Sequence, residues 1–419
     1  MSVEKKVPKI RFKRFSGEWV DSVLKSFSDS FSYGLNASAV KFDGVNKYLR
    51  ITDIDEKSGR FDYCQLTSPD TDLSKYDDYL LKNGDVLFAR TGASVGKTYI
   101  YNEQDGKVYF AGFLIRASIN HKASAQFIFQ NTQTNEYSKF VATTSQRSGQ
   151  PGINAKEYGE YRLFSPTKPE QTQIGSYFQK LDTLINQHQQ KHDKLSSIKK
   201  SMLGKMFPKQ GESTPEIRFK GFSGEWENLT IGDCSSLITK GTTPMTIGKS
   251  FVDRGVTFVK VECVDEIGNL NPAKFAYIDA ETDQVLARSR IKESDLLVSI
   301  AGALGRAAIV KKEILPANTN QALAIVRLKN DSPIGVNFLY HFTKTRDFKE
   351  FVDETASQGA QPNLSLGDIS KLRILAPKKE EQTAIGNYFH KLDALVNQHQ
   401  QQITKLNNIK QACLSKMFV

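Results

Sequence analysis

Two stretches of the sequence are nearly identical: residues 171–190 read QTQIGSYFQKLDTLINQHQQ, and residues 382–401 read QTAIGNYFHKLDALVNQHQQ. Fifteen of these twenty positions match, at an offset of 211 residues. Ahead of them, residues 8–19 (PKIRFKRFSGEW) and 215–226 (PEIRFKGFSGEW) match at ten of twelve positions, at an offset of 207. The two offsets differ by only four residues, so the chain is a tandem duplication of two similar halves.

Between these anchors the two copies diverge. Residues 25–140 and 232–350 align only in short patches. Nearly identical segments indicate two similar surfaces that meet similar partners, or each other. Divergent segments on a shared scaffold indicate two different targets, although loops that simply drifted after the duplication would look the same.

Both repeated stretches have the composition and spacing of a long helix. The first, over residues 170–206, contains no proline, and Pro208 ends it. Its apolar positions step by three and four residues, as they do along the seam of a coiled coil. These seam positions are Ile174, Phe178, Leu181, Ile185, Leu195 and Met202 in the first copy, and Ile385, Phe389, Leu392, Val396, Ile403, Leu406, Cys413 and Met417 in the second.

Each helix would be about 55 Å long at ~1.5 Å per residue. A single helix of this kind cannot bury its apolar stripe, so we expect the helix over 170–206 to pack on the one over 381–417. The spacing leaves the relative direction of the two helices open. The alternative is that each helix packs on its own domain.

Two histidines, His188 and His399, fall on the seam at equivalent positions. His188 and His192 also stand four residues apart, as metal ligands on a helix can. The second copy has Ile403 in place of His192, and no glutamate separates the histidines to act as a base. We therefore predict a polar layer that fixes the helix register, and no metal site.

The divergent segments, each of about 150 residues, carry mixed signals that predict an α+β fold. Strands are expected at 86–88, 257–261 and 323–326, where β-branched and aromatic residues run together. Helices are expected at 124–142 and 335–353.

The charge balance favours a polyanionic partner. There are 57 Lys+Arg against 46 Asp+Glu, a net charge of +11 and a pI of about 9.2. A membrane surface or plain solubility would account for the charge as well. However, no apolar run approaches a membrane span, and the first residues lack the apolar core of a signal peptide. The four cysteines form no CxxC pair, so we expect a reduced, cytoplasmic protein without a zinc ribbon.

Several loops suit contact with nucleic acid. Loop 89–97 and its counterpart 299–306 combine glycines with a terminal cation, which suits a phosphate. Loops 146–154, 238–244 and 358–363 carry Gln, Asn, Arg and Lys, which read base edges or phosphates. The alternative is that these are ordinary polar turns. The candidates are Arg50, Arg90, Thr91, Lys97, Arg147, Ser148, Gln150, Asn154, Lys240, Thr242, Lys260, Arg306, Gln358, Gln361 and Asn363.

Motifs for catalysis are missing. The segment from Gly92 to Thr98 resembles a phosphate-binding loop, but it has three residues between its glycines where that motif needs four. The segment Asn271-Pro272-Ala273-Lys274-Phe275 lacks the second proline of an adenine-methyltransferase motif. No nuclease or Ser-His-Asp pattern stands above background. We therefore expect a chain without catalysis of its own.

Taken together, these duplicated motifs closely resemble the specificity subunits of type I restriction–modification systems over essentially the whole chain. The matching elements are RFKxFSGEW, GDVLFARTGASVGK with SDLLVSIAGALGR, the Gln-Pro loops, and the repeated helix starts. The resemblance implies an α+β fold with two target-recognition domains separated by two long helices, packed antiparallel as a pseudo-twofold repeat. The implied parts are 1–167, 168–212 with the first helix and linker, 213–376, and 377–419 with the second helix.

The resemblance also implies a function. Each domain would read one half of an asymmetric, bipartite site on double-stranded DNA, and the helices would set the gap. Two copies of a DNA adenine methyltransferase subunit, and motor-nuclease subunits, would bind the chain. This chain would hold no cofactor, whereas the partners would use S-adenosylmethionine, ATP and Mg. The rival readings are a methyltransferase or nuclease with unrecognised motifs and a coiled-coil protein–protein adaptor.

Overall fold

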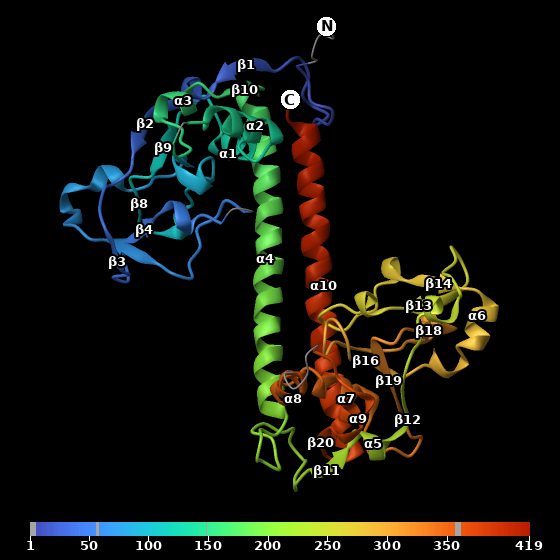
Figure 1. The fold of residues 1–419 in the computed structure, drawn as a ribbon. Helices are drawn as coiled ribbons and strands as arrows, with labels where there is room; N and C mark the ends of the chain where they lie inside the picture. The colour runs from blue at the N-terminus through green and yellow to red at the C-terminus, as the bar shows by residue number, and fades with distance from the viewer. Residues whose placement is uncertain (1–5, 56–57, 148, 357–361) are drawn as a thin grey trace. The chain divides into compact units, whose positions relative to one another are not determined.

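The computed structural model describes residues 6–55, 58–147, 149–356 and 362–419. The chain divides into two compact units. Unit 1 comprises Met1–Gln190 with His399–Val419, and unit 2 comprises Lys191–Gln398. Two helices of 39 residues, α4 (Lys168–Met206) and α10 (Lys379–Met417), each contribute to both units (Figure 1). We call the part of unit 1 before α4 the first domain, and the part of unit 2 between α4 and α10 the second domain.

The first domain is built from short strands and helices of mixed type. Its elements are β1 (Val20–Val23), β2 (Ser28–Tyr33), β3 (Ala39–Lys41), β4 (Lys47–Leu49), β5 (Thr67–Pro69), β6 (Asp85–Ala89), β7 (Thr98–Ile100), β8 (Val108–Phe110), β9 (Leu114–Ile119), β10 (Arg162–Ser165), α1 (Ala125–Asn131), α2 (Asn135–Thr144) and α3 (Ala155–Gly159). Single 3-10 turns lie at η1 (Leu24–Phe27), η2 (Ile51–Asp53), η3 (Leu73–Lys75), η4 (Asp77–Tyr79), η5 (Gly92–Ser94) and η6 (Glu103–Asp105).

The second domain repeats most of this order. Its elements are β11 (Glu227–Thr230), β12 (Ser235–Lys240), β13 (Val256–Val259), β14 (Ala276–Ile278), β15 (Arg290–Ile291), β16 (Leu296–Ser299), β17 (Ala307–Ile309), β18 (Ala317–Thr319), β19 (Leu323–Leu328), β20 (Arg373–Ala376), α5 (Ile231–Cys234), α6 (Ala280–Val285), α7 (Val336–Phe342), α8 (Arg346–Ala356) and α9 (Leu366–Lys371). Its 3-10 turns are η7 (Pro244–Ile247), η8 (Val261–Cys263), η9 (Pro272–Lys274), η10 (Ala287–Ser289) and η11 (Lys312–Ile314).

An antiparallel four-stranded sheet forms the centre of each domain. The strand order is β2-β9-β6-β7 in the first and β12-β19-β16-β17 in the second, so the two copies share one topology. Successive residues of a strand point to opposite faces. Val86 and Phe88 of β6 accordingly pack in one core, whereas Leu87 and Ala89 pack in another. The α+β prediction is confirmed, as are the predicted strands at 86–88 and 323–326, which lie in these sheets. The strand predicted at 257–261 is β13 of a second sheet, and it ends at Val259 because Val261 begins the 3-10 turn η8.

The predicted helices at 124–142 and 335–353 are each two helices, which corrects the reading from composition. In the first domain a turn after Asn131 separates α1 from α2, and the Thr134 hydroxyl accepts a hydrogen bond from the Tyr137 backbone N–H at 3.4 Å. Thr345 does the same for Phe348 in the second domain. A threonine at this place starts a new helix, because its side chain satisfies one of the unpaired N–H groups of the first turn.

An ion pair attaches the start of each long helix to the segment that precedes its domain. The Arg11 guanidinium donates two hydrogen bonds to the Glu170 carboxylate, both at 2.7 Å, and Glu170 is 1% exposed. Arg218 donates to Glu381 at 2.7 and 2.6 Å in the second copy. A bidentate pair of this kind fixes orientation as well as distance. The repeated RF and EQ motifs are therefore two sides of one structural contact.

The glutamine that follows each of these glutamates joins the helix to its domain. Gln171 Oε1 accepts from the Ser124 backbone N–H at 3.0 Å, and its amide donates to Ser165 Oγ at 2.8 Å. In the second copy, Gln382 accepts from the Gly335 N–H and donates to the Pro377 carbonyl, both at 2.8 Å. Both glutamines are buried, so each helix start is anchored in a domain core.

Within each unit the two long helices pack against each other. In unit 1, Lys410 Nζ lies 2.7 Å from an Asp182 carboxylate oxygen, and the Nδ1 atoms of His188 and His399 lie 2.9 Å apart. Residue numbers rise along α4 while they fall along α10, so the pairing is antiparallel. In unit 2, Lys199 pairs with Asp393 at positions equivalent to Lys410 and Asp182. The predicted antiparallel helix pair is confirmed.

The predicted seam residues differ in how deeply they are buried. Eight of them are buried, and six are half-buried, namely Ile185, Leu195, Met202, Val396, Leu406 and Cys413. The buried ones are Ile174, Phe178, Leu181, Ile385, Phe389, Leu392, Ile403 and Met417. The first turns also pack on their own domain, because Ile174 and Phe178 share a core with Phe127. Both packing modes considered from the sequence therefore occur together.

The far end of each helix completes the core of a unit. Phe418, just after α10, packs on Trp19, Phe127 and Phe178 of unit 1, with ring centroids 5.4 to 6.4 Å apart. Phe207, just after α4, packs in the same way on Trp226, Phe338 and Phe389 of unit 2. The C-terminal end of each helix is thus as much a core element as its start.

One core position carries a titratable group in the second copy only. His341 of α7 is 2% exposed, and no described residue binds its Nδ1. Burial lowers the pKa of His341 to about 3, and Lys199 and Lys344 add repulsion. The equivalent residue of α1 is Gln130, which donates to Asp182 at 2.8 Å. The second copy therefore folds around a neutral imidazole that resists protonation.

This difference predicts an acid-sensitive stability. The folded pKa of His341 lies below its ordinary value of 6.5, so its contribution is complete above pH 6.5 and is lost as the pH falls toward 3. We expect His341→Gln, which copies the first domain, to reduce the loss of unfolding free energy between pH 7.5 and 5.0 by roughly 1–2 kcal/mol. Urea unfolding of the full chain at both pH values measures it.

The matched control is His121→Gln, because His121 is an exposed histidine of the first domain. Its loss of stability on acidification should equal that of the wild type. If His341→Gln behaves like this control, the imidazole of His341 is not what makes the fold acid-sensitive.

Candidate nucleic-acid interface

Two of the loops predicted to contact nucleic acid lie against each other in the first domain. Thr91 forms an antiparallel bridge with Gly152, and the Ile153 backbone N–H donates to the Arg90 carbonyl at 2.9 Å. In the second domain, Ala301 bridges Asn363, and the Leu364 N–H donates to the Ile300 carbonyl at 2.9 Å. The structure thus brings the two loops together in both copies through the same backbone contacts.

A third segment, the turn between β8 and β9, closes the group. The Arg90 N–H donates to the Phe113 carbonyl at 3.0 Å, and the Leu35 N–H donates to the Phe110 carbonyl at 2.8 Å. Gly34 is required here, because a Cβ would stand 2.2 Å from the Ala111 carbonyl oxygen. Gly241 meets Thr319 in the same way, so this close approach is common to both domains.

These segments border a groove in the first domain of about 630 Å³. It holds two of the predicted residues, Arg50 and Arg90, and two exposed aromatic side chains that the sequence reading missed. The exposed aromatics are Tyr33 (44% exposed) and Phe113 (56% exposed). The lining is completed by Gly34, Leu35, Asn36, Ala37, Ala39, Tyr48, Ile51, Thr52, Ala111 and Gly112.

Most of the predicted cations are bound to carboxylates. Arg50 donates to Asp53 at 2.9 and 2.7 Å, and this contact raises the pKa of Arg50 further. Arg147 pairs with Glu157. In the second domain Lys260 pairs with Glu262 at 2.7 Å, and Arg306 approaches Glu266 at 3.3 Å. These side chains serve the fold of the loops first, and a phosphate would have to compete for them.

Two further predicted residues have structural duties. The Asn154 side chain accepts from the Glu157 N–H at 2.9 Å and caps α3. Ser365, rather than a second asparagine, caps α9 at the equivalent place. Lys97 and Arg306 end their loops at equivalent positions. The Lys97 carbonyl accepts from the Ala89 N–H, and the Arg306 carbonyl accepts from the Ser299 N–H, both at 2.8 Å. The side chain of Lys97 lines a separate hollow of about 340 Å³ beside Gly96 and Tyr137.

The remaining predicted residues lie on the surface or outside the described residues. Gln150 and Asn363 are exposed on the Gln-Pro loops. Lys240 is exposed at the end of β12, and the Thr242 N–H donates to the Thr319 carbonyl at 3.2 Å. Predictions at Ser148, Gln358 and Gln361 fall outside the residues that the structure describes.

Arg90 differs from the other predicted arginines. Its guanidinium carbon lies 4.9 Å from the centroid of the Tyr33 ring, and no described residue accepts a hydrogen bond from the guanidinium. Tyr33 aligns with Lys240, and Arg90 aligns with Ile300. The two domains therefore present different side chains on one backbone frame. Tyr33 could have been identified only from its position at the end of β2, next to these loops. That position follows from the strand register.

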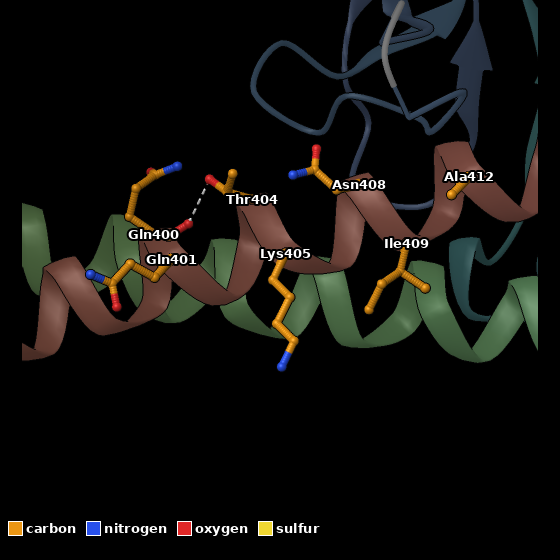
Figure 2. Close-up of a pocket in the computed structure, with 7 residues that line it drawn as sticks. All are labelled: Gln400, Gln401, Thr404, Lys405, Asn408, Ile409 and Ala412. Carbon is orange, nitrogen blue, oxygen red and sulfur yellow. Dashed lines mark hydrogen bonds between the residues drawn. The ribbon is translucent and has the colours of Figure 1, made fainter. Parts of the chain in front are cut away.

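A third hollow, of about 590 Å³, lies along α10 in unit 1 (Figure 2). Its lining comes from this one helix, and the Thr404 hydroxyl donates to the Gln400 carbonyl at 3.0 Å. Walls from a single helix do not enclose a small ligand. The lining residues are Gln400, Gln401, Thr404, Lys405, Asn408, Ile409 and Ala412.

Among the described residues no three His, Cys, Asp or Glu side chains gather as a metal would require. His192 instead lies 3.0 Å from Asp193. None of the helices in the described ranges is long and apolar enough to span a membrane.

Comparison with known proteins agrees with this geometry. The family model described as "Type I restriction modification DNA specificity domain" matches residues 19–197 and again residues 224–408. The chain belongs to this family. The two matches are the two halves of the internal repeat, each ending within one of the long helices.

Relatives and solved structures extend the likeness. The chain is 28% identical over 169 residues to the type I restriction enzyme EcoBI specificity subunit of Escherichia coli, which covers 39% of this chain and 35% of that relative. It is 21% identical over 414 residues, 96% of this chain and 93% of the relative, to a putative type I restriction enzyme MjaX specificity subunit of Methanocaldococcus jannaschii. The fold matches the S subunit of a type I system from M. genitalium, with a TM-score of 0.65, 14% identity and 99% of both chains covered.

Proposed function

We propose that this chain selects the DNA sequence for a type I restriction–modification complex in the cytoplasm, with each domain reading one half of an asymmetric, two-part site. The observation that carries this proposal is the contrast within the repeat. The backbone frame of the loops is the same in both domains, but the side chains on it differ. Tyr33 and Arg90 of the first domain are replaced by Lys240 and Ile300 at the equivalent positions of the second. A shared frame with different side chains suits two related but unequal targets.

Electrostatics support DNA as the target. The net charge of +11 favours a polyanion, and phosphate contacts supply much of the affinity of DNA-binding proteins. Since several loop cations are already paired with carboxylates, we infer that Arg90 and Lys240 contribute most to contacts with the DNA. Gln150 and Asn363, exposed beside them, supply groups that can pair with base edges.

We place catalysis on partner subunits, which would bring S-adenosylmethionine, ATP and Mg. Two copies of a methyltransferase subunit need two similar docking surfaces, and the long helices offer them. Leu184 is 42% exposed on α4, and Leu395 is 43% exposed at the identical position of α10. Lys180 and Gln187, with Lys391 and Gln398, are exposed on the same helix faces. These residues are exposed, so core packing does not explain why they are identical in α4 and α10. Binding of the same partner by both helices accounts for it.

We also propose that the helices determine the gap between the two half-sites. Each helix begins in one unit and ends in the other, over 39 residues or about 58 Å at ~1.5 Å per residue. An α-helix is stiff on this scale, and two that pack antiparallel are stiffer. A motor-nuclease subunit would join the complex for restriction.

The modular reading is tested by replacing residues 20–165 with residues 227–376 of the same chain. Both segments run from the first strand of a domain to the last, so the replacement keeps every junction. We expect the complex to methylate a symmetric site that carries the original second half twice. Mapping N6-methyladenine in cells that express this chain with its partners measures the site. Methylation of an unrelated sequence would contradict independent domains.

The docking faces are tested by charge. A lysine in place of Leu184 or Leu395 places an ammonium where we expect an apolar contact, so each single variant should bind one methyltransferase subunit and the double variant none. Native mass spectrometry of the purified complexes counts the subunits. Val285→Lys is the matched control, because Val285 is 60% exposed on α6, away from the long helices. Loss of no subunit from the double variant would refute these faces.

The spacing proposal is tested by inserting four residues after Gln190 and four after Gln401. Because the helices are antiparallel, both insertions fall near the His188–His399 contact. Four residues add about 6 Å and turn the helix by slightly more than one full turn, so the seam keeps its face. The gap between half-sites should grow by one or two base pairs at ~3.4 Å each, with both half-sites retained. An unchanged gap in the methylation map would rule out the helices as the measure.

A further inference from the structure

The Arg90 backbone is held from both sides. Its N–H donates to the Phe113 carbonyl at 3.0 Å, and its carbonyl accepts from the Ile153 N–H at 2.9 Å. The first bond ties it to the turn between β8 and β9, and the second to the Gln-Pro loop. The Cα of Arg90 is therefore fixed at the meeting point of three loops, where a side chain can be aimed accurately.

The Arg90 side chain is held as well, by Tyr33. The guanidinium carbon lies 4.9 Å from the centre of the Tyr33 ring. The Tyr33 hydroxyl accepts a hydrogen bond from the Ala155 backbone N–H at 3.3 Å, so the ring is attached to the first residue of α3. A guanidinium stacked on a fixed ring keeps its plane, and less side-chain entropy is lost when it binds.

The donors of Arg90 are not used within the chain, since no described residue accepts a hydrogen bond from its guanidinium. Arg50, in the same groove, is bound bidentately by Asp53. The groove around Arg90 is bordered by the aromatic rings of Phe113 and Tyr33, and its other cation among the described residues, Arg50, is already neutralised by Asp53. Such surroundings suit the flat edge of a base better than a phosphate, because a phosphate site usually contains several positively charged groups.

We infer that Arg90 reads a guanine in the half-site recognised by the first domain, with Tyr33 as its positioning residue. A planar fork of two N–H groups matches the O6 and N7 acceptors of guanine in the major groove. The second domain carries Ile300 at the position of Arg90 and cannot make this contact, so the guanine belongs to one half-site only. This inference rests on the proposed function, because it assigns one base of the site that the chain is proposed to select.

The experiment selects DNA from a library in which both half-sites are randomised, with the full chain in complex with its methyltransferase partners. Wild type should recover a two-part sequence with an invariant guanine in one half. Arg90→Ala should lose the preference for that guanine by about 10- to 100-fold, with every other position unchanged. Arg90→Lys keeps the charge but not the fork, so it should lose the same preference.

A positioning role for Tyr33 gives a graded result. Tyr33→Phe keeps the ring and should retain most of the guanine preference. Tyr33→Leu removes the stacking face and should relax that same position and no other. Arg14→Ala is the matched control, because Arg14 stands 5.0 Å over the ring of Phe15, is exposed, and lies outside the groove.

The selection experiment distinguishes recognition of a base by Arg90 from contact with the DNA backbone. If binding by Arg90→Ala falls equally for every sequence and the salt dependence drops by about one phosphate contact, Arg90 holds the backbone and the inference is wrong. It is also wrong if the first half-site is unchanged, or if the altered position lies in the second half-site. If wild type selects no two-part sequence at all, it is the proposed function that fails.

Discussion

The core of each unit depends on the C-terminal end of a long helix that begins in the other unit. Unit 1 includes Phe418 from the end of α10, packed on Trp19 and Phe127, and unit 2 includes Phe207 from the end of α4, packed on Trp226 and Phe338. Phe207 is 5% exposed, and removing a phenylalanine buried to this extent costs about 3–5 kcal/mol, a large share of the stability of a domain, whereas Phe418 is half-buried. Neither domain can therefore be considered without both helices, and the helices cannot move away without opening a core.

This constraint explains which residues the two copies share. The Arg11–Glu170 pair, the buried Gln171 and the interhelical Asp182–Lys410 pair all reappear at the equivalent positions of the second copy. Breaking a buried ion pair by removing one partner is strongly destabilising, so these positions tolerate little change. The loops between the strands do not take part in these contacts between the helices and the domains. They can differ as long as the backbone contacts below them are kept.

The sequence alone predicted the two long helices, their seam and a polar layer at His188 and His399, because a repeat offset and a helical period are local properties. It did not predict that the loop cations would be paired. The partner of Arg147 is ten residues away, and that of Arg306 is forty residues away, so only tertiary structure brings them together. Arg50 and Asp53 are three residues apart, and their pairing was readable from spacing. Tyr33 and Phe113 were missed because an exposed aromatic gives no periodic signal.

The loops of the two domains can differ without any change in the scaffold. Loop 89–97 is one residue longer than loop 299–306, yet Gly96 and Gly305 donate to equivalent strand carbonyls at 3.0 Å. Both glycines have positive φ values of 87° and 75°, a conformation that other residues rarely adopt. A difference in loop length is thus absorbed between two fixed points. Side chains such as Arg90 can be replaced without disturbing the sheet that presents them, whereas the helix contacts below must stay as they are.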